Sequence, residues 1–204
     1  MSYSDNVLNY KSEFISQPDV VSKTDSYFLS TYIKKSNKDF KPESFNGQFI
    51  PGQIYCFRYN TKSQPDENRK FINRLPFVLV TDIKKNKQGD SILHGVDLVA
   101  TPPGNRINLI GSVYDYSKEE IEKIIKAKRE SKASSALQIN PSVVKEILSR
   151  RGYEASLYTF KIAAISDVCL IEYDDWKKLP YMSVALLEGS TPIEIYSDYR
   201  SKLK

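Results

Sequence analysis

This 204-residue chain has many charged side chains but almost no spacing of them that is typical of a catalytic site. The single histidine, His94, lies in an apolar, strand-like run, and no cluster of thiolates accompanies it. We therefore predict neither a metal site nor a bound cofactor. The carboxylate pairs Glu119-Glu120 and Asp174-Asp175 are neighbours in sequence, and neighbouring side chains point apart rather than toward one substrate. These groups predict no acid–base pair.

The segment Thr101–Arg106 (TPPGNR) lacks the glycine spacing and the lysine of a phosphate-binding loop. It predicts a rigid turn in which Arg106 bonds carbonyl groups or Asp97.

The two cysteines, Cys56 and Cys169, lie far apart, each within an apolar run. With no secretory signal and no framework of paired cysteines, they are expected to be reduced core residues. No stretch reaches the length of a membrane span, so no membrane association is expected.

The stretch from Phe49 to Ile110 predicts a small curled β-sheet. Strands are expected at Gln53–Tyr59, Pro76–Ile83 and Ser91–Ala100, and later at Thr159–Ser166 and Val168–Tyr173. In the first of them, Ile54 and Cys56 share one face and the aromatic residues share the other. Both faces of that strand are therefore expected to be buried. Charged loops are expected at Thr61–Asn73 and Lys84–Asp90.

Two helices are expected to be inserted in this sheet, over about residues 117–151. Ser117 and Glu120 form a capping box at the start of the first helix, and Asn140-Pro141 starts the second. The net charge of +5 comes in part from lysines between Lys118 and Lys132, but glutamates interleave with them. This mixture is typical of a solvated helix face rather than a track for phosphates.

The first 46 residues are polar, with scattered aromatic side chains, and only Asp25–Lys35 shows helical spacing. They predict an extended arm that gains order by lying on another surface. The 14 tyrosines of the chain fit either such a contact surface or the lining of the sheet, and both readings stay open. The predicted organisation is an arm (1–46), a β core (47–182) and a tail (183–204).

The core then resembles a family of tailed-bacteriophage virion proteins from the tail, baseplate or neck. That family shows a G-x-I-Y-x-F-x-Y opening, a later Gly-x-Asn-Leu followed by Pro-Pro-x-x-Arg, and a closing acidic residue before Trp. Asp97 stands here where the family has Asn. The matching positions are Gly52, Tyr55, Phe57, Tyr59, Leu75, Pro76, Val78, Gly95, Asp97, Leu98, Pro102, Pro103, Arg106, Ile171, Asp175 and Trp176.

The resemblance implies an α+β fold: a small curled antiparallel β-barrel of the Src-homology-3 shape, with two inserted helices and an extended N-terminal arm. It implies a non-enzymatic virion component, made in the host bacterial cytoplasm, that contacts other virion proteins and copies of itself. Some relatives are described as protecting DNA ends, so a DNA-end-binding protein is the first alternative, although DNA is not the favoured partner. The interaction candidates are Tyr27, Phe28, Tyr32, Arg69, Lys70, Lys84, Lys85, Arg106 and Trp176.

The same block also resembles the MazF-like ribonuclease toxins, which are built on a small barrel. The resemblance implies two catalytic candidates: Arg74, which would stabilise charge at the cleaved phosphate, and Thr101, whose hydroxyl would assist. A base would also be needed to activate the ribose 2′-hydroxyl. Leu75 separates Arg74 from Pro76, where the toxins have arginine and proline adjacent, and two prolines follow Thr101. The toxin reading is therefore kept only as the lesser alternative.

Overall fold

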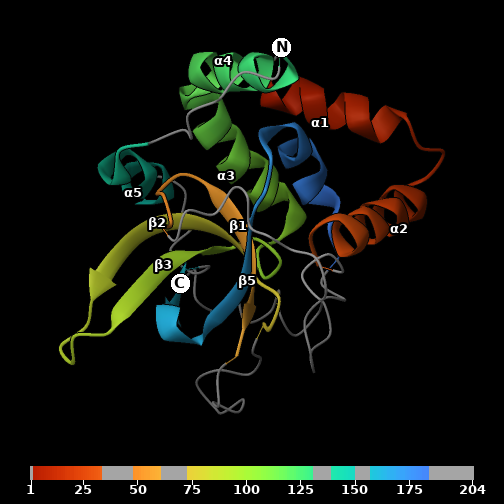
Figure 1. The fold of residues 1–204 in the computed structure, drawn as a ribbon. Coiled ribbons are helices and arrows are strands. Elements are labelled where there is room, and N and C mark those ends of the chain that lie inside the picture. Colours follow the sequence, from red (N-terminus) through yellow and green to blue (C-terminus); the bar gives the residue numbers. More distant parts are fainter. Residues whose placement is uncertain (1, 34–47, 61–72, 131–138, 150–156, 184–204) are drawn as a thin grey trace.

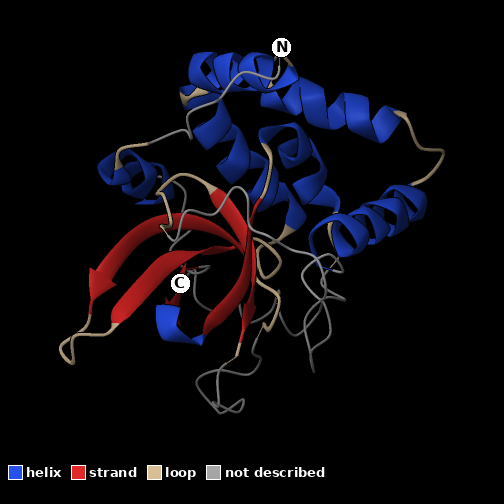
Figure 2. Ribbon diagram, in the orientation of Figure 1, coloured by secondary structure: helices blue, strands red, loops and turns tan. Residues whose placement is uncertain are grey.

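The computed structural model describes residues 2–33, 48–60, 73–130, 139–149 and 157–183. Its described strands form one antiparallel five-stranded sheet in the order β4-β3-β2-β1-β5. Helices gather along one side of this sheet (Figures 1 and 2). The predicted α+β class is confirmed. The strands are β1 (Ile54–Tyr59), β2 (Phe77–Lys85), β3 (Ser91–Asp97), β4 (Leu157–Lys161) and β5 (Ile165–Leu170).

The sheet is strongly curved but open. The outer strands β4 and β5 are each paired on one side only, so the sheet is not closed into a barrel. A single 3-10 turn, η4 (Ile162–Ala164), joins them. The β2–β3 hairpin ends in a tight turn in which the Asn86 side-chain oxygen accepts from the backbone N–H groups of Gln88 and Asp90. Gly89 has a positive φ of 86° there, which glycine adopts without steric cost.

Both faces of β1 are buried, as its alternation predicts. Ile54 and Cys56 belong to the larger hydrophobic cluster, which the helices cover. Tyr55, Phe57 and Tyr59 belong to a second cluster, in which Phe57 and Tyr59 pack edge-on against the Phe160 ring of β4. The two cysteines are buried free thiols, as expected.

Besides η4, the described residues contain seven helical elements. The expected inserted helices are present as α4 and α5. The elements other than η4 are α1 (Tyr3–Ser12), α2 (Gln17–Phe28), the π-helical turn η1 (Leu29–Ile33), α3 (Pro103–Tyr116), α4 (Lys118–Arg129), α5 (Pro141–Ser149) and the 3-10 helix η5 (Tyr173–Tyr181).

The expectation of an extended N-terminal arm is wrong for the residues that the structure describes. Ser2 forms a capping box with Asp5 at the start of α1, and the Ser16 hydroxyl caps α2. Once helical, each segment places its larger side chains in one stripe, and the stripes enter the main core. The buried stripes are Tyr3, Val7 and Tyr10 on α1, and Val20, Thr24 and Phe28 on α2.

The segment Thr101–Arg106 leads into a helix rather than forming an isolated rigid turn. Pro103 is the first residue of α3, a position where the missing N–H of proline costs nothing. The proline pair hid this helix from the sequence analysis because prolines usually end a periodic pattern. The predicted bonds between Arg106 and carbonyl groups are present, as described below.

Candidate functional site

An apolar groove of about 570 Å³ lies between α1, α2, the start of α3 and the end of η5. We call it the α1–α2 groove. Its α1 wall is the stripe Ser4, Val7, Leu8 and Lys11, whose spacing places them on one helical face. The remaining lining residues are Gln17, Val21, Pro103, Ile107, Pro180, Tyr181, Met182 and Ser183.

Apolar side chains near this groove reach solvent. Leu8 is 62% exposed on the groove wall, and Ile15, in the link between α1 and α2, is fully exposed. Covering a side chain of this size stabilises an interface by roughly 1.5–3 kcal/mol. A hollow of this volume with a continuous apolar lining is typical of a binding site.

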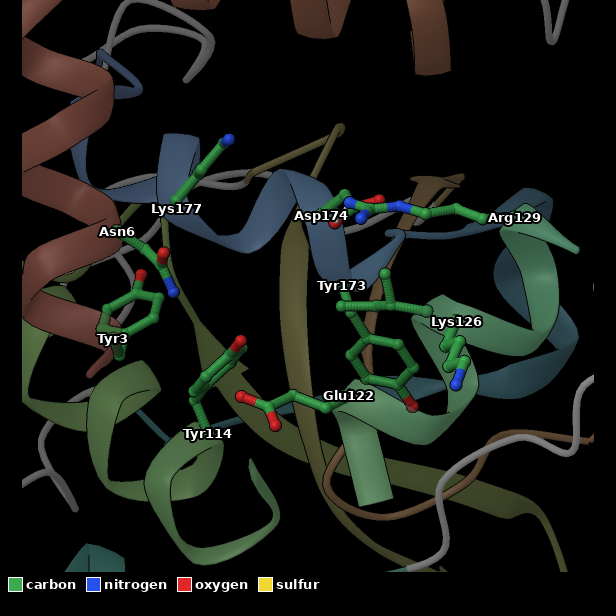
Figure 3. Close-up of a pocket in the computed structure, with 10 residues that line it drawn as sticks. Tyr3, Asn6, Tyr114, Glu122, Lys126, Arg129, Tyr173, Asp174 and Lys177 are labelled. Carbon is green, nitrogen blue, oxygen red and sulfur yellow. Dashed lines mark hydrogen bonds and ion pairs between the residues drawn. The ribbon is translucent and has the colours of Figure 1, made fainter. Parts of the chain in front are cut away.

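A second hollow, of about 470 Å³, is polar and lies between α1, α3, α4 and η5 (Figure 3). Three tyrosines and five charged residues are among its lining residues. In Figure 3 the Glu122 carboxylate points toward the side of the Tyr114 ring. The lining residues are Tyr3, Asn6, Tyr114, Glu122, Ile125, Lys126, Arg129, Tyr173, Asp174 and Lys177.

The tyrosines of the polar hollow are hydrogen-bond donors rather than bases. Burial raises the pKa of Tyr3 well above its ordinary value, and burial followed by the charge of Glu122 raises the pKa of Tyr114. Both hydroxyls therefore stay protonated at neutral pH. The Tyr3 hydroxyl donates to the Trp176 carbonyl at 2.8 Å, and Asp174 accepts from Arg129 at 3.5 Å. This arrangement favours polar recognition over proton transfer.

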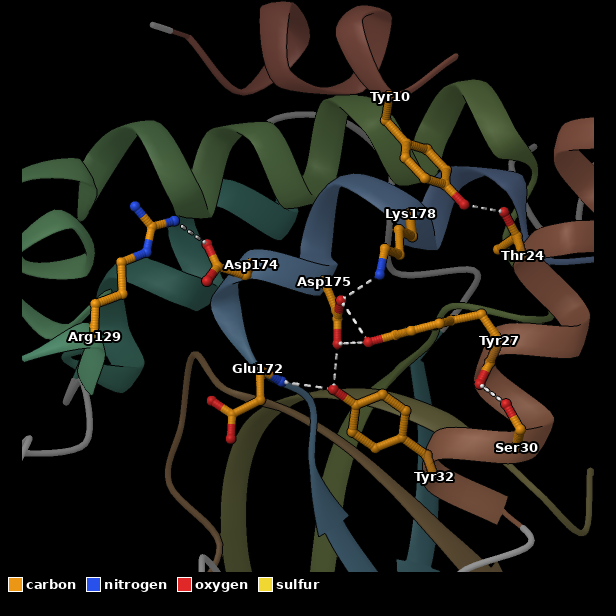
Figure 4. A network of polar contacts seen from close by, with 10 residues as sticks. All are labelled: Tyr10, Thr24, Tyr27, Ser30, Tyr32, Arg129, Glu172, Asp174, Asp175 and Lys178. Carbon is orange, nitrogen blue, oxygen red and sulfur yellow. Dashed lines mark hydrogen bonds and ion pairs between the residues drawn. The ribbon is translucent and has the colours of Figure 1, made fainter. Parts of the chain in front are cut away.

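A buried carboxylate, Asp175, holds the end of α2 against η5 (Figure 4). It accepts hydrogen bonds from the hydroxyls of Tyr27 and Tyr32 and from the Lys178 ammonium at 2.7 Å. The ammonium also lies 3.3 Å from the centroid of the Tyr27 ring. Burial acts to lower the pKa of Lys178, but the hydrogen bond to the Asp175 carboxylate and the charge of that carboxylate raise the pKa by more. The net shift of the Lys178 pKa is upward, so the ammonium stays charged.

Replacing Asp175 with asparagine is expected to lower the free energy of unfolding by about 2–3 kcal/mol, because an amide N–H₂ would then face a buried donor. Hydrogen exchange should accelerate most in α2 and η1, which this carboxylate anchors. The matched control is Asp174→Asn, since the Asp174 side chain is 55% exposed and pairs with Arg129 at 3.5 Å. Equal urea midpoints for the two variants would contradict the anchoring role.

Several sequence-predicted interaction residues are core residues instead. Phe28, Arg106 and Trp176 are fully buried, and Tyr32 is nearly so. The Trp176 indole N–H donates to the Ile171 carbonyl at 3.2 Å, which anchors η5 to the residue after β5. Tyr27 is half-buried and bonded to Asp175. Long-range packing therefore removes these side chains from any contact surface.

The remaining predicted residues are scattered. Lys84 and Lys85 are exposed near the end of β2, and Lys84 pairs with Asp82 at 3.4 Å. Arg69 and Lys70 lie outside the described residues. Arg74 is half-buried, and Thr101 is fully buried with its hydroxyl donating to the Asp97 carbonyl at 2.7 Å. That hydroxyl serves the fold and faces no solvent.

Asp97 is a second buried carboxylate, at the end of β3. It accepts hydrogen bonds from the Asn73 amide at 2.8 Å and from the Val99 backbone N–H at 3.1 Å. Burial raises its pKa from 3.8 to about 6, although these donors and the nearby Arg106 charge act in the opposite direction. The folded protein therefore binds the Asp97 proton more tightly than the unfolded chain does.

Protonated Asp97 stabilises the fold below the unfolded-state pKa, and this contribution is lost as the pH rises through about 6. Compared with Asp97→Asn, which cannot titrate, the unaltered protein should lose roughly 2–3 kcal/mol of unfolding free energy between about pH 4 and pH 7.5. Urea unfolding at several pH values measures this difference. Asp82→Asn is the control: burial raises the pKa of Asp82, but Lys145 and the other donors together lower it by more, so its step lies at acidic pH. Parallel curves for the unaltered protein and Asp97→Asn would contradict the prediction.

The α1–α2 groove was not predicted from the sequence. The available signal was that Leu8 directly follows Val7 on α1. An apolar residue at the edge of a buried stripe widens the apolar face of the helix beyond the part that the core covers. That signal is visible only once the segment is known to be helical. Within the described ranges, no group of three histidine, cysteine or acidic residues could hold a metal ion.

Comparisons with known proteins give no relative for this chain. No family model matches it, and neither a curated protein nor a solved structure gives a significant match. Of the helices that the structure describes, none combines the length and the apolar character that a membrane span requires.

Proposed function

We propose that this protein is a non-enzymatic structural component of a tailed-phage virion, located in the tail, baseplate or neck. It acts through contacts with other virion proteins. The observation that carries the proposal is the α1–α2 groove, an apolar hollow with Leu8 exposed on its wall and Ile15 exposed in the adjoining link. Apolar surface of this kind is typical of protein contacts. The resemblance of residues 52–176 to phage virion proteins supplies the setting.

The curled sheet also supports the proposed barrel shape. Only the three residues of η4 connect the outer strands β4 and β5, so the end of β4 must lie near the start of β5. Phe57, Tyr59 and Phe160 fill the space inside the curve. We propose that the sheet is an opened form of the Src-homology-3 barrel and serves as a rigid body for the helices.

Binding to DNA ends is the less favoured function. Lysines near the β2–β3 hairpin are partly neutralised, because Lys84 and Lys145 both pair with Asp82 and Lys161 pairs with Asp90 at 3.5 Å. A DNA-binding protein should show an affinity that falls steeply with salt, in proportion to the phosphates contacted. The ribonuclease alternative is weakened by the burial of the Thr101 hydroxyl.

Mass spectrometry of purified particles from the source phage tests the proposed function. We expect the chain at a fixed number of copies per particle, retained through density-gradient purification. Its absence from intact particles would overturn the proposal. In parallel, neither the unaltered protein nor Arg74→Ala should cleave RNA. If the protein were a nuclease, Arg74→Ala would lose RNA cleavage while keeping its fold.

A further inference from the structure

The α1–α2 groove extends along α2. A neighbouring hollow of about 640 Å³ shares Gln17, Val21 and Ser183 with it and continues past Pro18 to Leu29. The two hollows together follow the outer face of α2, from its first turn to its end. This elongated hollow beside α2 is apolar at its α1 end and has more polar side chains toward Leu29, so it is suited to an amphipathic helical segment rather than to a compact small molecule.

The groove is positively charged at its borders. Lys11 is the charged residue that lines it, and it lies in the last turn of α1. Pro103, the first residue of α3, also lines it, and the first turn of α3 has neither an acidic residue nor a side-chain cap. The positive end of the α3 dipole therefore adds to the Lys11 charge. By contrast, α1 and α2 have Asp5 and Asp19 in their first turns.

The same charges disfavour a second copy of the chain as the occupant. A two-fold dimer brings identical patches together, so that the two Lys11 ammonium groups and the two α3 N-termini would lie on one interface. Like charges placed together cost binding energy.

We propose that the α1–α2 groove binds an amphipathic helical segment of a partner protein. Its apolar face covers Leu8, Val21 and Ile107, and its acidic side chains face Lys11 and the start of α3. The α1 wall from Ser4 to Lys11 is about 10 Å long, so this wall alone contacts about two turns of the partner helix. The identification of the partner as a virion protein rests on the function proposed above. The preference for an acidic amphipathic helix rests on the groove alone.

Two labelled peptides of about 16 residues, long enough for about four turns, test the proposal with the full-length protein. Both carry leucines at helical i, i+3, i+4 and i+7 positions, with glutamates on the flanks of one peptide and lysines on those of the other. Fluorescence anisotropy should show about tenfold tighter binding of the acidic peptide. Lys11→Glu should reverse the preference. Leu8→Ser should weaken acidic-peptide binding about fivefold while leaving the urea midpoint unchanged, since Leu8 is exposed.

Leu157→Ser is the matched control, because Leu157 is also an exposed leucine, at 42%, but lies on β4. It should leave binding unchanged. Absence of saturable binding, equal affinity for both peptides, or no effect of Leu8→Ser would overturn the proposal. Sedimentation of the unaltered protein as a dimer that Leu8→Ser dissociates would assign the groove to a second copy and overturn it too. None of these results bears on whether the chain is present in particles, so the two proposals fail separately.

Discussion

Replacing Arg106 with methionine is expected to lower the free energy of unfolding by about 4 kcal/mol, because breaking a buried charged network leaves its partners unsatisfied. The guanidinium is fully buried and donates to four backbone carbonyls. Its Nε bonds the Thr101 carbonyl at 2.6 Å, and Nη2 bonds that of Val99 at 3.0 Å. Nη1 bonds the carbonyls of Leu179 at 3.3 Å and Met182 at 2.6 Å. These bonds tie the turn after β3 to the end of η5.

Two controls separate this structural role from a surface role. Arg106→Lys keeps the charge but places its donors on one atom, so it should recover only part of the lost stability. Arg129→Met removes an arginine that is 73% exposed and should cost no more than about 0.5 kcal/mol. Urea unfolding at pH 7.5 measures all three variants.

The loss in Arg106→Met should also grow with pH. The Arg106 charge acts to lower the pKa of the buried Asp97, so its removal raises that pKa above about 6. Ionised Asp97 then costs more, and the penalty at about pH 8 should exceed the penalty at about pH 5. If Arg106→Met instead folded normally but no longer bound a partner protein, Arg106 would be an interaction residue after all.

Replacing Gly95 with valine is expected to destabilise the protein by more than about 3 kcal/mol, at the upper end of the cost of overpacking. Gly95 lies in the middle of β3, paired with Val80 of β2 and Tyr158 of β4. A Cβ atom there would overlap Val78 Cγ1 and lie 2.7 Å from the Leu79 carbonyl oxygen. The second contact is with backbone, so relief requires the β2–β3 pairing itself to shift.

Gly95→Ala should show most of this loss, because its single Cβ already makes both contacts. Gly104→Ala is the matched control, since nothing lies within 4 Å of the Cβ position and helix α3 gains propensity. Gly104→Ala should therefore be neutral or slightly stabilising. Thermal unfolding of the variants measures the difference. A melting temperature of Gly95→Ala equal to that of Gly104→Ala would show that the sheet accommodates the extra Cβ atom without loss of stability.

The sequence by itself determined the local elements of the core. Alternation in Ile54–Tyr59 placed the two faces of β1 correctly, and the capping residues Ser117 and Asn140-Pro141 located the starts of α4 and α5. The buried thiols followed from their apolar surroundings. These features depend on neighbouring residues, and a periodic pattern expresses them directly.

Only the tertiary structure decided which surfaces the protein shows. The N-terminal helices join the core through distant contacts, such as the bond of the Tyr3 hydroxyl to Trp176, 173 residues away in sequence. Distant packing also buries Arg106 and Trp176, which were predicted to be interaction candidates alongside the family resemblance. This packing also leaves Leu8 exposed above an apolar groove. Burial depends on which elements meet, and local periodicity does not contain that information.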